Sequence, residues 1–157
     1  RELVRDHPCA VLTPHAGEFE RLYAATLGRE LDLSKGLGVR LRELSDALDC
    51  FILHKGRITT VTAPGQKIYG MNAGHSYAAT AGSGDVLSGI LGATLAQVDA
   101  AEADAETITM EILHATAIHQ HAAAIAAHTP DGFGLCSASQ IAAAVPQAIA
   151  RLLVMQR

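Results

Sequence analysis

Short apolar, β-branched runs alternate with helical patterns along this chain of 157 residues, and this alternation constrains its fold more than any other feature. Residues 10–13 and 51–54 are apolar runs that end in loop signals, as buried strands do. Residues 58–63 and 67–71 flank a Pro-Gly turn and predict a hairpin. Strands that alternate with helices favour an α/β layered domain with a partly parallel sheet.

Helical patterns account for most of the remaining chain. Apolar periodicity predicts helices over residues 17–28, 35–48, 85–98, 105–128 and 137–153. The third of these is apolar nearly all round, which indicates a buried helix. Neither an internal repeat nor a shift in composition marks a linker, so residues 1–157 are expected to form a single domain.

Composition narrows the class of function. Hydrophobic residues make up 49% and charged residues 18%, which is typical of a globular chain. A formal net charge of -4 disfavours nucleic acid as the main partner. Apolar runs stay below the roughly 18 residues that a membrane span needs, so a membrane is not expected. Cys9, Cys50 and Cys136 are widely spaced and predict reduced thiols in a cytoplasmic protein.

The sequence Ala-Gly-Ser-Gly-Asp-Val-Leu at residues 81–87 opens directly into the expected buried helix. Free N–H groups at a helix start bind anions, so Gly82, Ser83 and Gly84 are candidates for an anion hole. Asp85 would repel a phosphate unless it serves as general base for a neighbouring hydroxyl. Alternatively, Asp85 only caps the helix and the glycines only form a turn. The missing Gly-Lys-Ser/Thr excludes a Walker-type loop.

A second candidate segment is Lys55-Gly56-Arg57-Ile58-Thr59, where one expected strand ends and the next begins. Strand ends are where α/β folds bind ligands. Lys55 suits a phosphate and Thr59 suits a hydrogen bond to a nucleotide. The alternative is an exposed turn with a solvated Lys-Arg pair.

Histidines are the third group of candidates. His15 and Glu18 lie at a predicted helix start, where Glu18 complements the helix dipole, although a single histidine at such a point is commonly structural. His114, His121 and His128 recur every seven residues. Metal-binding pairs on a helix are usually three or four residues apart, so no metal site is expected there.

In order along the chain, four motifs together resemble the NAD(P)H-hydrate dehydratase family of the ribokinase-like superfamily. They are Thr-Pro-His-x-Gly-Glu at residues 13–18, Lys-Gly-x-x-Thr at 55–59, an Asn-containing loop at 72–74, and Ala-Thr-x-Gly-Ser-Gly-Asp-Val-Leu at 79–87. The resemblance covers essentially the whole chain and corresponds to the C-terminal half of the family's domain. Gly-Ser-Gly-Asp alone indicates only the superfamily, whereas Pro-His-x-Gly-Glu is more specific.

This resemblance implies a ribokinase-like layered fold with a central, mostly parallel sheet flanked by helices. It implies that His15 and Asn72 contact the hydrated nicotinamide dinucleotide, with Asp85 at the substrate as catalytic base. It further implies that residues 55–59 line the site for ADP or ATP, with Gly84 at the phosphate. The nucleotide's terminal phosphoryl group would pass to the hydroxyl of the hydrate, phosphate would then leave, and Mg²⁺ would bridge the nucleotide phosphates.

The chain departs from the family pattern in three places. Ala16 stands where a second Pro is usual, and residues 72–82 are one residue short, with His75 and Ser76 where Asn-Pro is common. The family's N-terminal portion has no counterpart here, so half a sheet, an exposed edge and an incomplete cleft are expected. A longer native protein is the expected active form.

Two other functions remain open at this point. A kinase for a small alcohol, such as a vitamin precursor, would use the same Gly-Ser-Gly-Asp turn. A non-catalytic nucleotide-binding module would need the turn but not the base. The alanine-rich helices could pack against another subunit, so a homo-oligomer is expected, and the sequence leaves ADP and ATP open as donors.

Overall fold

The computed structural model describes residues 9–72, 76–99 and 102–155. Residues 73 and 74 of the Asn-containing loop expected at the substrate, and His75 after them, lie outside the described residues. The chain divides into two units. The first comprises Arg1–Asn72 and Val98–Met110, and the second comprises Ala73–Gln97 and Glu111–Arg157.

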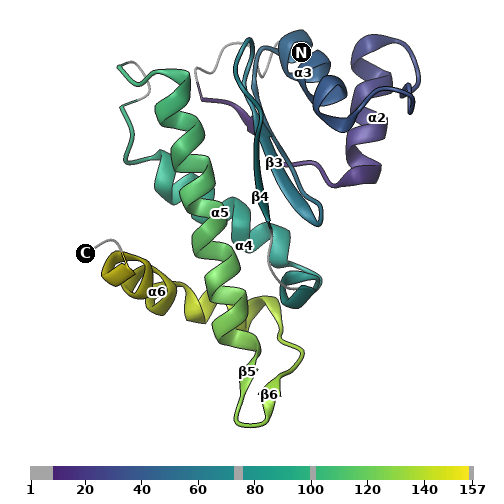
Figure 1. Ribbon diagram of the computed structural model, residues 1–157. Coiled ribbons are helices and arrows are strands. Elements are labelled where there is room, and N and C mark those ends of the chain that lie inside the picture. The colour runs from purple at the N-terminus through teal and green to yellow at the C-terminus, as the bar shows by residue number, and fades with distance from the viewer. Residues whose placement is uncertain (1–8, 73–75, 100–101, 156–157) are drawn as a thin grey trace. The chain divides into compact units, whose positions relative to one another are not determined.

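A four-stranded sheet forms the centre of the first unit (Figure 1). Its strands lie in sequence order: β1 (Val11–Leu12), β2 (Phe51–His54), β3 (Ile58–Thr62) and β4 (Tyr69–Asn72). β1 pairs with β2 in parallel, whereas β2 with β3 and β3 with β4 are antiparallel. The α/β class is therefore confirmed, but the expectation of a mostly parallel sheet is wrong for the described strands.

The lengths of the connections explain these directions. The helices α2 (Ala16–Leu27) and α3 (Leu37–Leu48) lie between β1 and β2, and a crossover of this length permits a parallel pair. Only residues 55–57 separate β2 from β3, and only residues 63–68 separate β3 from β4. A parallel connection needs about a dozen residues or more, so both pairs close as hairpins.

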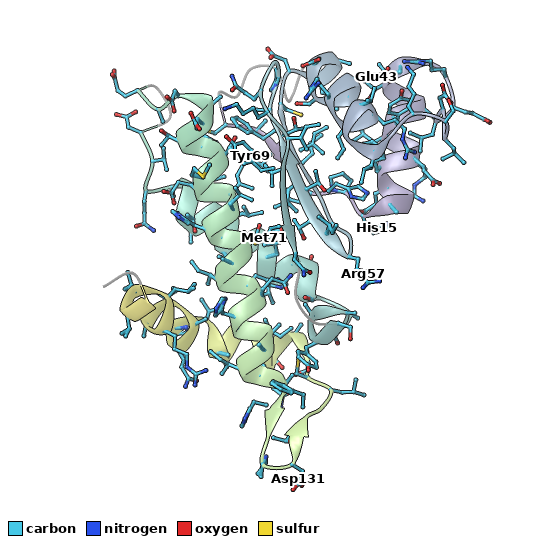
Figure 2. All side chains as sticks on the ribbon, viewed as in Figure 1. His15, Glu43, Arg57, Tyr69, Met71 and Asp131 are labelled. Carbon is cyan, nitrogen blue, oxygen red and sulfur yellow. The ribbon has the colours of Figure 1, made fainter. Side chains whose placement is uncertain are left out.

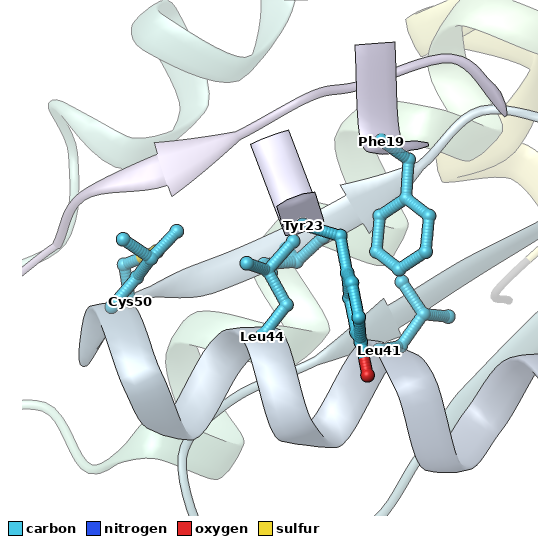
Figure 3. Close-up of a cluster of buried hydrophobic side chains, with 7 residues drawn as sticks. Phe19, Tyr23, Leu41, Leu44 and Cys50 are labelled. Atoms are coloured by element: carbon cyan, nitrogen blue, oxygen red, sulfur yellow. The ribbon is translucent and has the colours of Figure 1, made fainter. Parts of the chain in front are cut away.

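α2 and α3 pack against one face of this sheet through a cluster of buried side chains (Figure 3). Tyr23 from α2, Leu41 and Leu44 from α3, and Ile52 from β2 are completely buried. The other buried members are Phe19, Leu48 and Cys50. Burial of each large apolar side chain contributes about 1.5–3 kcal/mol, so this cluster fixes both helices on the strands that precede and follow them.

The second unit consists mainly of helices (Figure 1). They are α4 (Ser83–Leu95), the part of α5 (Ala105–Ala127) that follows Met110, and α6 (Ala138–Met155). A short 3₁₀ helix, η1 (Ser76–Ala78), precedes α4, and the small hairpin of β5 (His128–Thr129) and β6 (Gly132–Phe133) follows α5. The buried cluster is built mostly from small side chains: Ala122, Ala123, Ala127, Cys136, Ile141, Ala144 and Ala148. None of the helices in the described part of the chain has both the length and the hydropathy to cross a membrane.

Candidate functional site

Several of the predicted site residues meet at one end of the sheet in the first unit. His15 follows β1 and Lys55 follows β2, and the two residues form a parallel bridge. Ile58 begins β3 and pairs with Asn72, the last residue of β4. Figure 2 shows His15 and Arg57 at this same end of the sheet. It is the end at which β1, β2 and β4 finish, where strand ends of α/β folds offer ligands a crevice.

His15 is held at this end by a reciprocal cap on α2. The Glu18 N–H donates to His15 Nδ1 at 3.3 Å, and the His15 N–H donates to Glu18 Oε2 at 2.8 Å. The backbone N–H of His15, helped by the nearby Lys55 ammonium, holds the pKa of Glu18 below its ordinary value. Since Nδ1 accepts a hydrogen bond, a neutral His15 ring carries its proton on Nε2 and presents a donor on a side chain that is 56% exposed.

The turn between β2 and β3 carries the predicted nucleotide residues. Lys55 lies 3.8 Å from Glu18 through its Nζ, and Gly56, Arg57 and Ile58 are exposed. A Cβ on Gly56 would lie 3.3 Å from the carbonyl oxygen of Ile58, so the turn leaves little room for a side chain there. Thr59 is buried inside the sheet. The exposed part of the predicted nucleotide segment is therefore Gly56, Arg57 and Ile58, with Lys55 half-buried beside them.

His54 lies next to this turn, and none of the sequence motifs predicts a role for it. It is 7% exposed, and its ring meets the Phe19 ring edge-on with centroids 5.4 Å apart. Among the described residues, Nδ1 of His54 has no hydrogen-bond partner. Burial lowers the pKa of His54, and the charges of Arg40 and His15 lower it further. A neutral ring therefore lies close to Gly56 on the buried side of the turn.

In the second unit, the glycine turn leads into α4 as the sequence predicts. Gly82 takes a left-handed conformation with φ 83°, and its carbonyl oxygen accepts from the N–H groups of Asp85 and Val86 at 3.1 and 3.2 Å. The Ser83 N–H donates to the carbonyl of Thr80 at 3.1 Å, whereas the Gly84 N–H is paired with no backbone carbonyl among the described residues. An unpaired amide at a helix start is suited to an anion. Asp85 is exposed in the same first turn.

An apolar groove of about 750 Å³ runs along α4, α5 and α6 of the second unit. Its lining is mostly aliphatic, for example Ile90, Val145 and Leu153, and includes none of residues 82–85. Because a phosphate needs hydrogen-bond donors, this groove is not the predicted anion site. The described residues also contain no group of three or more His, Cys, Asp or Glu side chains that could hold a metal ion.

The mixed α/β sheet and the glycine turn at the start of α4 agree with a ribokinase-like fold. The expectation that this helix is buried is wrong, because only Ser83, Leu87, Ile90 and Leu91 of α4 are buried. A ribokinase-like superfamily protein of Enterococcus faecalis superimposes with a TM-score of 0.62 over 90% of this chain and 44% of its own. The ADP/ATP-dependent NAD(P)H-hydrate dehydratase of Bacillus subtilis, co-crystallized with ATP and Mg²⁺, gives 0.69 over 91% and 48%. Both are 23% identical to this chain and therefore establish the fold alone.

The chain belongs to the NAD(P)H-hydrate dehydratase family, whose sequence model matches residues 2–143. The bifunctional NAD(P)H-hydrate repair enzyme Nnr of Corynebacterium glutamicum is 38% identical over 97% of this chain and 29% of its own length. The ADP-dependent (S)-NAD(P)H-hydrate dehydratase of Neisseria meningitidis is 36% identical over 62% of this chain and 32% of its own length. The family resemblance of the four motifs is thus confirmed, and the chain spans less than a third of either of these relatives.

Proposed function

We propose that this chain takes part in the nucleotide-dependent dehydration of (S)-NAD(P)H hydrate to NAD(P)H. The observation that carries the proposal is the Gly82–Asp85 turn at the start of α4, within a chain of the dehydratase family. Relatives named as ADP-dependent and as ATP-dependent (S)-NAD(P)H-hydrate dehydratases support a nucleotide as the second substrate. The reaction repairs a damaged cofactor and does not consume NAD(P)H.

Asp85 is the proposed general base. It would take the proton from the hydroxyl of the hydrate while the hydroxyl oxygen attacks the terminal phosphorus of the nucleotide. The shortened nucleotide leaves in this first step. In the second step the carbon–oxygen bond of the phosphate ester breaks and phosphate leaves with its electron pair. The neighbouring carbon releases a proton to solvent, and the double bond of NAD(P)H forms between the two carbons. The exposed position of Asp85 in the first helical turn leaves its carboxylate accessible to a hydroxyl.

The proposed anion hole is formed by Gly82, Ser83 and Gly84. Backbone N–H groups at a helix start offset the negative charge that builds on a transferred phosphoryl group, which is the main requirement of such transfers. Of their three N–H groups, that of Ser83 is bonded to Thr80, whereas those of Gly82 and Gly84 are paired with no backbone carbonyl in the described part of the chain and are the proposed donors.

In the first unit, we assign His15 and Asn72 to the nicotinamide dinucleotide and the segment Lys55–Thr59 to the adenine nucleotide. The exposed His15 ring offers a donor, and the Lys55 ammonium lies at the same sheet end. Thr59, which is buried, would act from inside the sheet.

Mg²⁺ fits this arrangement only as an ion carried by the nucleotide. Magnesium is usually held by one or two carboxylates together with substrate phosphates, and Asp85 is the carboxylate beside the anion hole. The described residues provide no larger ligand group. When bound, the ion would neutralise phosphate charge, while the protein residues position the reactants.

The test is recovery of NADH absorbance from NADH hydrate, measured on the longest natural form of the protein with Mg²⁺ and either ADP or ATP. Asp85→Asn should lower kcat by about 10²–10⁴-fold, the usual contribution of a general base, while the nucleotide Kd stays within about threefold. The nucleotide that supports faster recovery identifies the donor.

Asp131→Asn is the matched control, because Asp131 is an exposed aspartate at the tip of the β5–β6 hairpin (Figure 2). It should leave turnover unchanged. A folded protein that binds ADP but recovers no NADH with either nucleotide would refute the proposal and favour a small-alcohol kinase or a binding module.

A further inference from the structure

Behind the glycine turn, on α5, lies a buried histidine that the proposed mechanism does not use. His119 is 4% exposed. Its Nε2 lies 3.0 Å from Ser83 Oγ and 3.0 Å from the carbonyl oxygen of Ser83. The ring therefore links α5 to the first residue of α4, although the two residues are 36 positions apart in the sequence.

These contacts determine where the proton of His119 resides. A carbonyl oxygen can only accept, so the ring nitrogen 3.0 Å from Ser83 O must carry the hydrogen. The neutral ring is thus the Nε2–H tautomer, and its N–H is shared between the carbonyl and hydroxyl oxygens of Ser83. Nδ1 has no hydrogen-bond partner among the described residues, and burial lowers the pKa of His119, so the ring stays neutral at pH 7.

Ser83 is the residue through which another side chain can fix the position of this turn. It is 4% exposed, and its neighbours Gly82 and Gly84 have no side chains through which they could be anchored. The direction of the open Gly84 N–H and the position of Asp85 both depend on where Ser83 lies. A support that fixes Ser83 therefore preorganises the donor and the carboxylate together.

We propose that His119 is a positioning residue whose Nε2–H, donated to Ser83, holds the turn at residues 82–85 in the geometry that binds phosphate and presents Asp85. This inference rests on the proposed function, because nucleotide-dependent turnover is its main readout. His119 itself touches neither substrate in this assignment and acts only through Ser83.

Two substitutions at His119 separate the effect of its hydrogen-bond donor from the effect of its ring volume. His119→Gln places an amide N–H at about the same reach as Nε2, whereas His119→Leu fills the space without a donor. His114→Leu and His114→Gln are matched controls, because His114 lies on the same helix and its side chain is 57% exposed. All variants are assayed in the longest natural form of the protein, with NADH hydrate, Mg²⁺ and the preferred nucleotide.

We expect His119→Leu to lower kcat/KM for the nucleotide by about tenfold or more, since one buried hydrogen bond of about 1.4 kcal/mol corresponds to a factor of ten. His119→Gln should remain within about threefold of the wild type, and both His114 variants within about twofold. If His119→Leu turns over like His114→Leu, or if the Gln variant loses as much as the Leu variant, the positioning role is refuted while the proposed function stands. A wild-type protein that recovers no NADH refutes the proposed function instead.

A spectroscopic measurement keeps the inference testable even if His119→Leu does not fold. In a ¹⁵N-histidine spectrum of the wild-type protein, the His119 signals, identified by their loss in His119→Gln, should show the neutral Nε2–H tautomer at pH 7. They should also shift on addition of the nucleotide. A protonated ring, an Nδ1–H tautomer or signals indifferent to the nucleotide would overturn the inference.

Discussion

Glu43 on α3 is the centre of an ion-pair network in the first unit, and removing its charge gives a sharp test of the structure. Its carboxylate accepts a hydrogen bond from the hydroxyl of the buried Tyr23 and contacts the side chains of Arg29 and Lys35. The bonds from Lys35 and Tyr23 lower the pKa of Glu43 from 4.5 to about 2. Glu43→Gln keeps an acceptor for Tyr23 but removes the charge.

The expected change in the free energy of unfolding follows from this pKa. A fall from 4.5 to about 2 corresponds to about 3.4 kcal/mol of stabilisation at full strength. The Glu43 side chain is 25% exposed and that of Arg29 is 49% exposed, so solvent screens part of this energy. Because exposed ion pairs are individually worth about 0.2–1 kcal/mol, we expect Glu43→Gln to lower the free energy of unfolding by about 1–2 kcal/mol at pH 7.

The pH dependence has a definite sign. Because the folded state lowers the pKa of Glu43, the ionised carboxylate stabilises the fold. The contribution is complete above about pH 4.5 and is lost as the pH falls toward about 2, so by pH 3 it should have fallen by more than half. The neutral Gln variant has no such dependence, and the two proteins should converge in acid.

Urea unfolding of the full protein, followed by circular dichroism and tyrosine fluorescence, measures this difference. Glu20→Gln is the control, since Glu20 is an exposed acidic residue of α2, and it should change stability by less than about 0.5 kcal/mol. Equal stabilities for the Glu43 and Glu20 variants at pH 7 would refute the network. So would a difference between wild type and Glu43→Gln that persists undiminished at pH 3.

Two further predictions concern the core and the glycine turn. Leu44→Ala should destabilise the protein by about 2–5 kcal/mol in denaturant unfolding, because Leu44 is completely buried; Val39→Ala, on the exposed side of α3, should cost less than about 1 kcal/mol. Gly82→Ala should cost about 1–2 kcal/mol and weaken nucleotide binding measured by titration calorimetry, because φ is 83° there. Gly89→Ala, inside α4 with open space around the new Cβ, should instead stabilise by about 0.5–1 kcal/mol and leave binding unchanged.

Local periodicity was sufficient to place most elements of the fold. The predicted helices at residues 17–28 and 35–48 correspond to Ala16–Leu27 and Leu37–Leu48, and the predicted strand at 51–54 matches β2. The start of α4 was predicted two residues late, because Ser83 and Gly84 are typical loop residues that here already belong to the helix. A helix start that is fixed by contacts with another helix can accommodate residues of low helix propensity.

Strand direction was predicted less well, for a physical reason. An apolar run reports that a strand is buried, not which strand it pairs with or in which direction. The Pro-Gly turn predicts the β3–β4 hairpin, whereas the Lys55-Gly56-Arg57 segment suits a ligand site or an exposed turn, and neither alternative predicts how β2 pairs with β3. The segment forms the turn of the β2–β3 hairpin, and the two antiparallel pairs beside the parallel β1–β2 pair make the sheet mixed.

Local sequence motifs predict the candidate residues, but they do not predict which residues these candidates contact in the fold. His119 and Ser83 are 36 residues apart, and His15 reaches Lys55 only because β1 and β2 pair across the α2–α3 crossover. Such contacts depend on tertiary structure, and a single sequence contains no periodic signal for them. His119 in particular was one histidine among eight in the chain.

In both units the candidate residues stand on a turn directly before a helix or strand, and a buried histidine lies close to each turn. His54 lies close to Gly56 and His119 lies behind Ser83, and within residues 9–72, 76–99 and 102–155 the Nδ1 of neither ring has a hydrogen-bond partner. The neutral, buried His119 ring can hold its turn through one N–H without adding a charge that would compete with a phosphate. A lysine or arginine in either place would add a buried positive charge, and a leucine would leave the Ser83 oxygens without the donor. If His119 positions the glycine turn as proposed, His119→Leu should lower nucleotide turnover while every motif residue remains in place, and His119→Gln should largely preserve it.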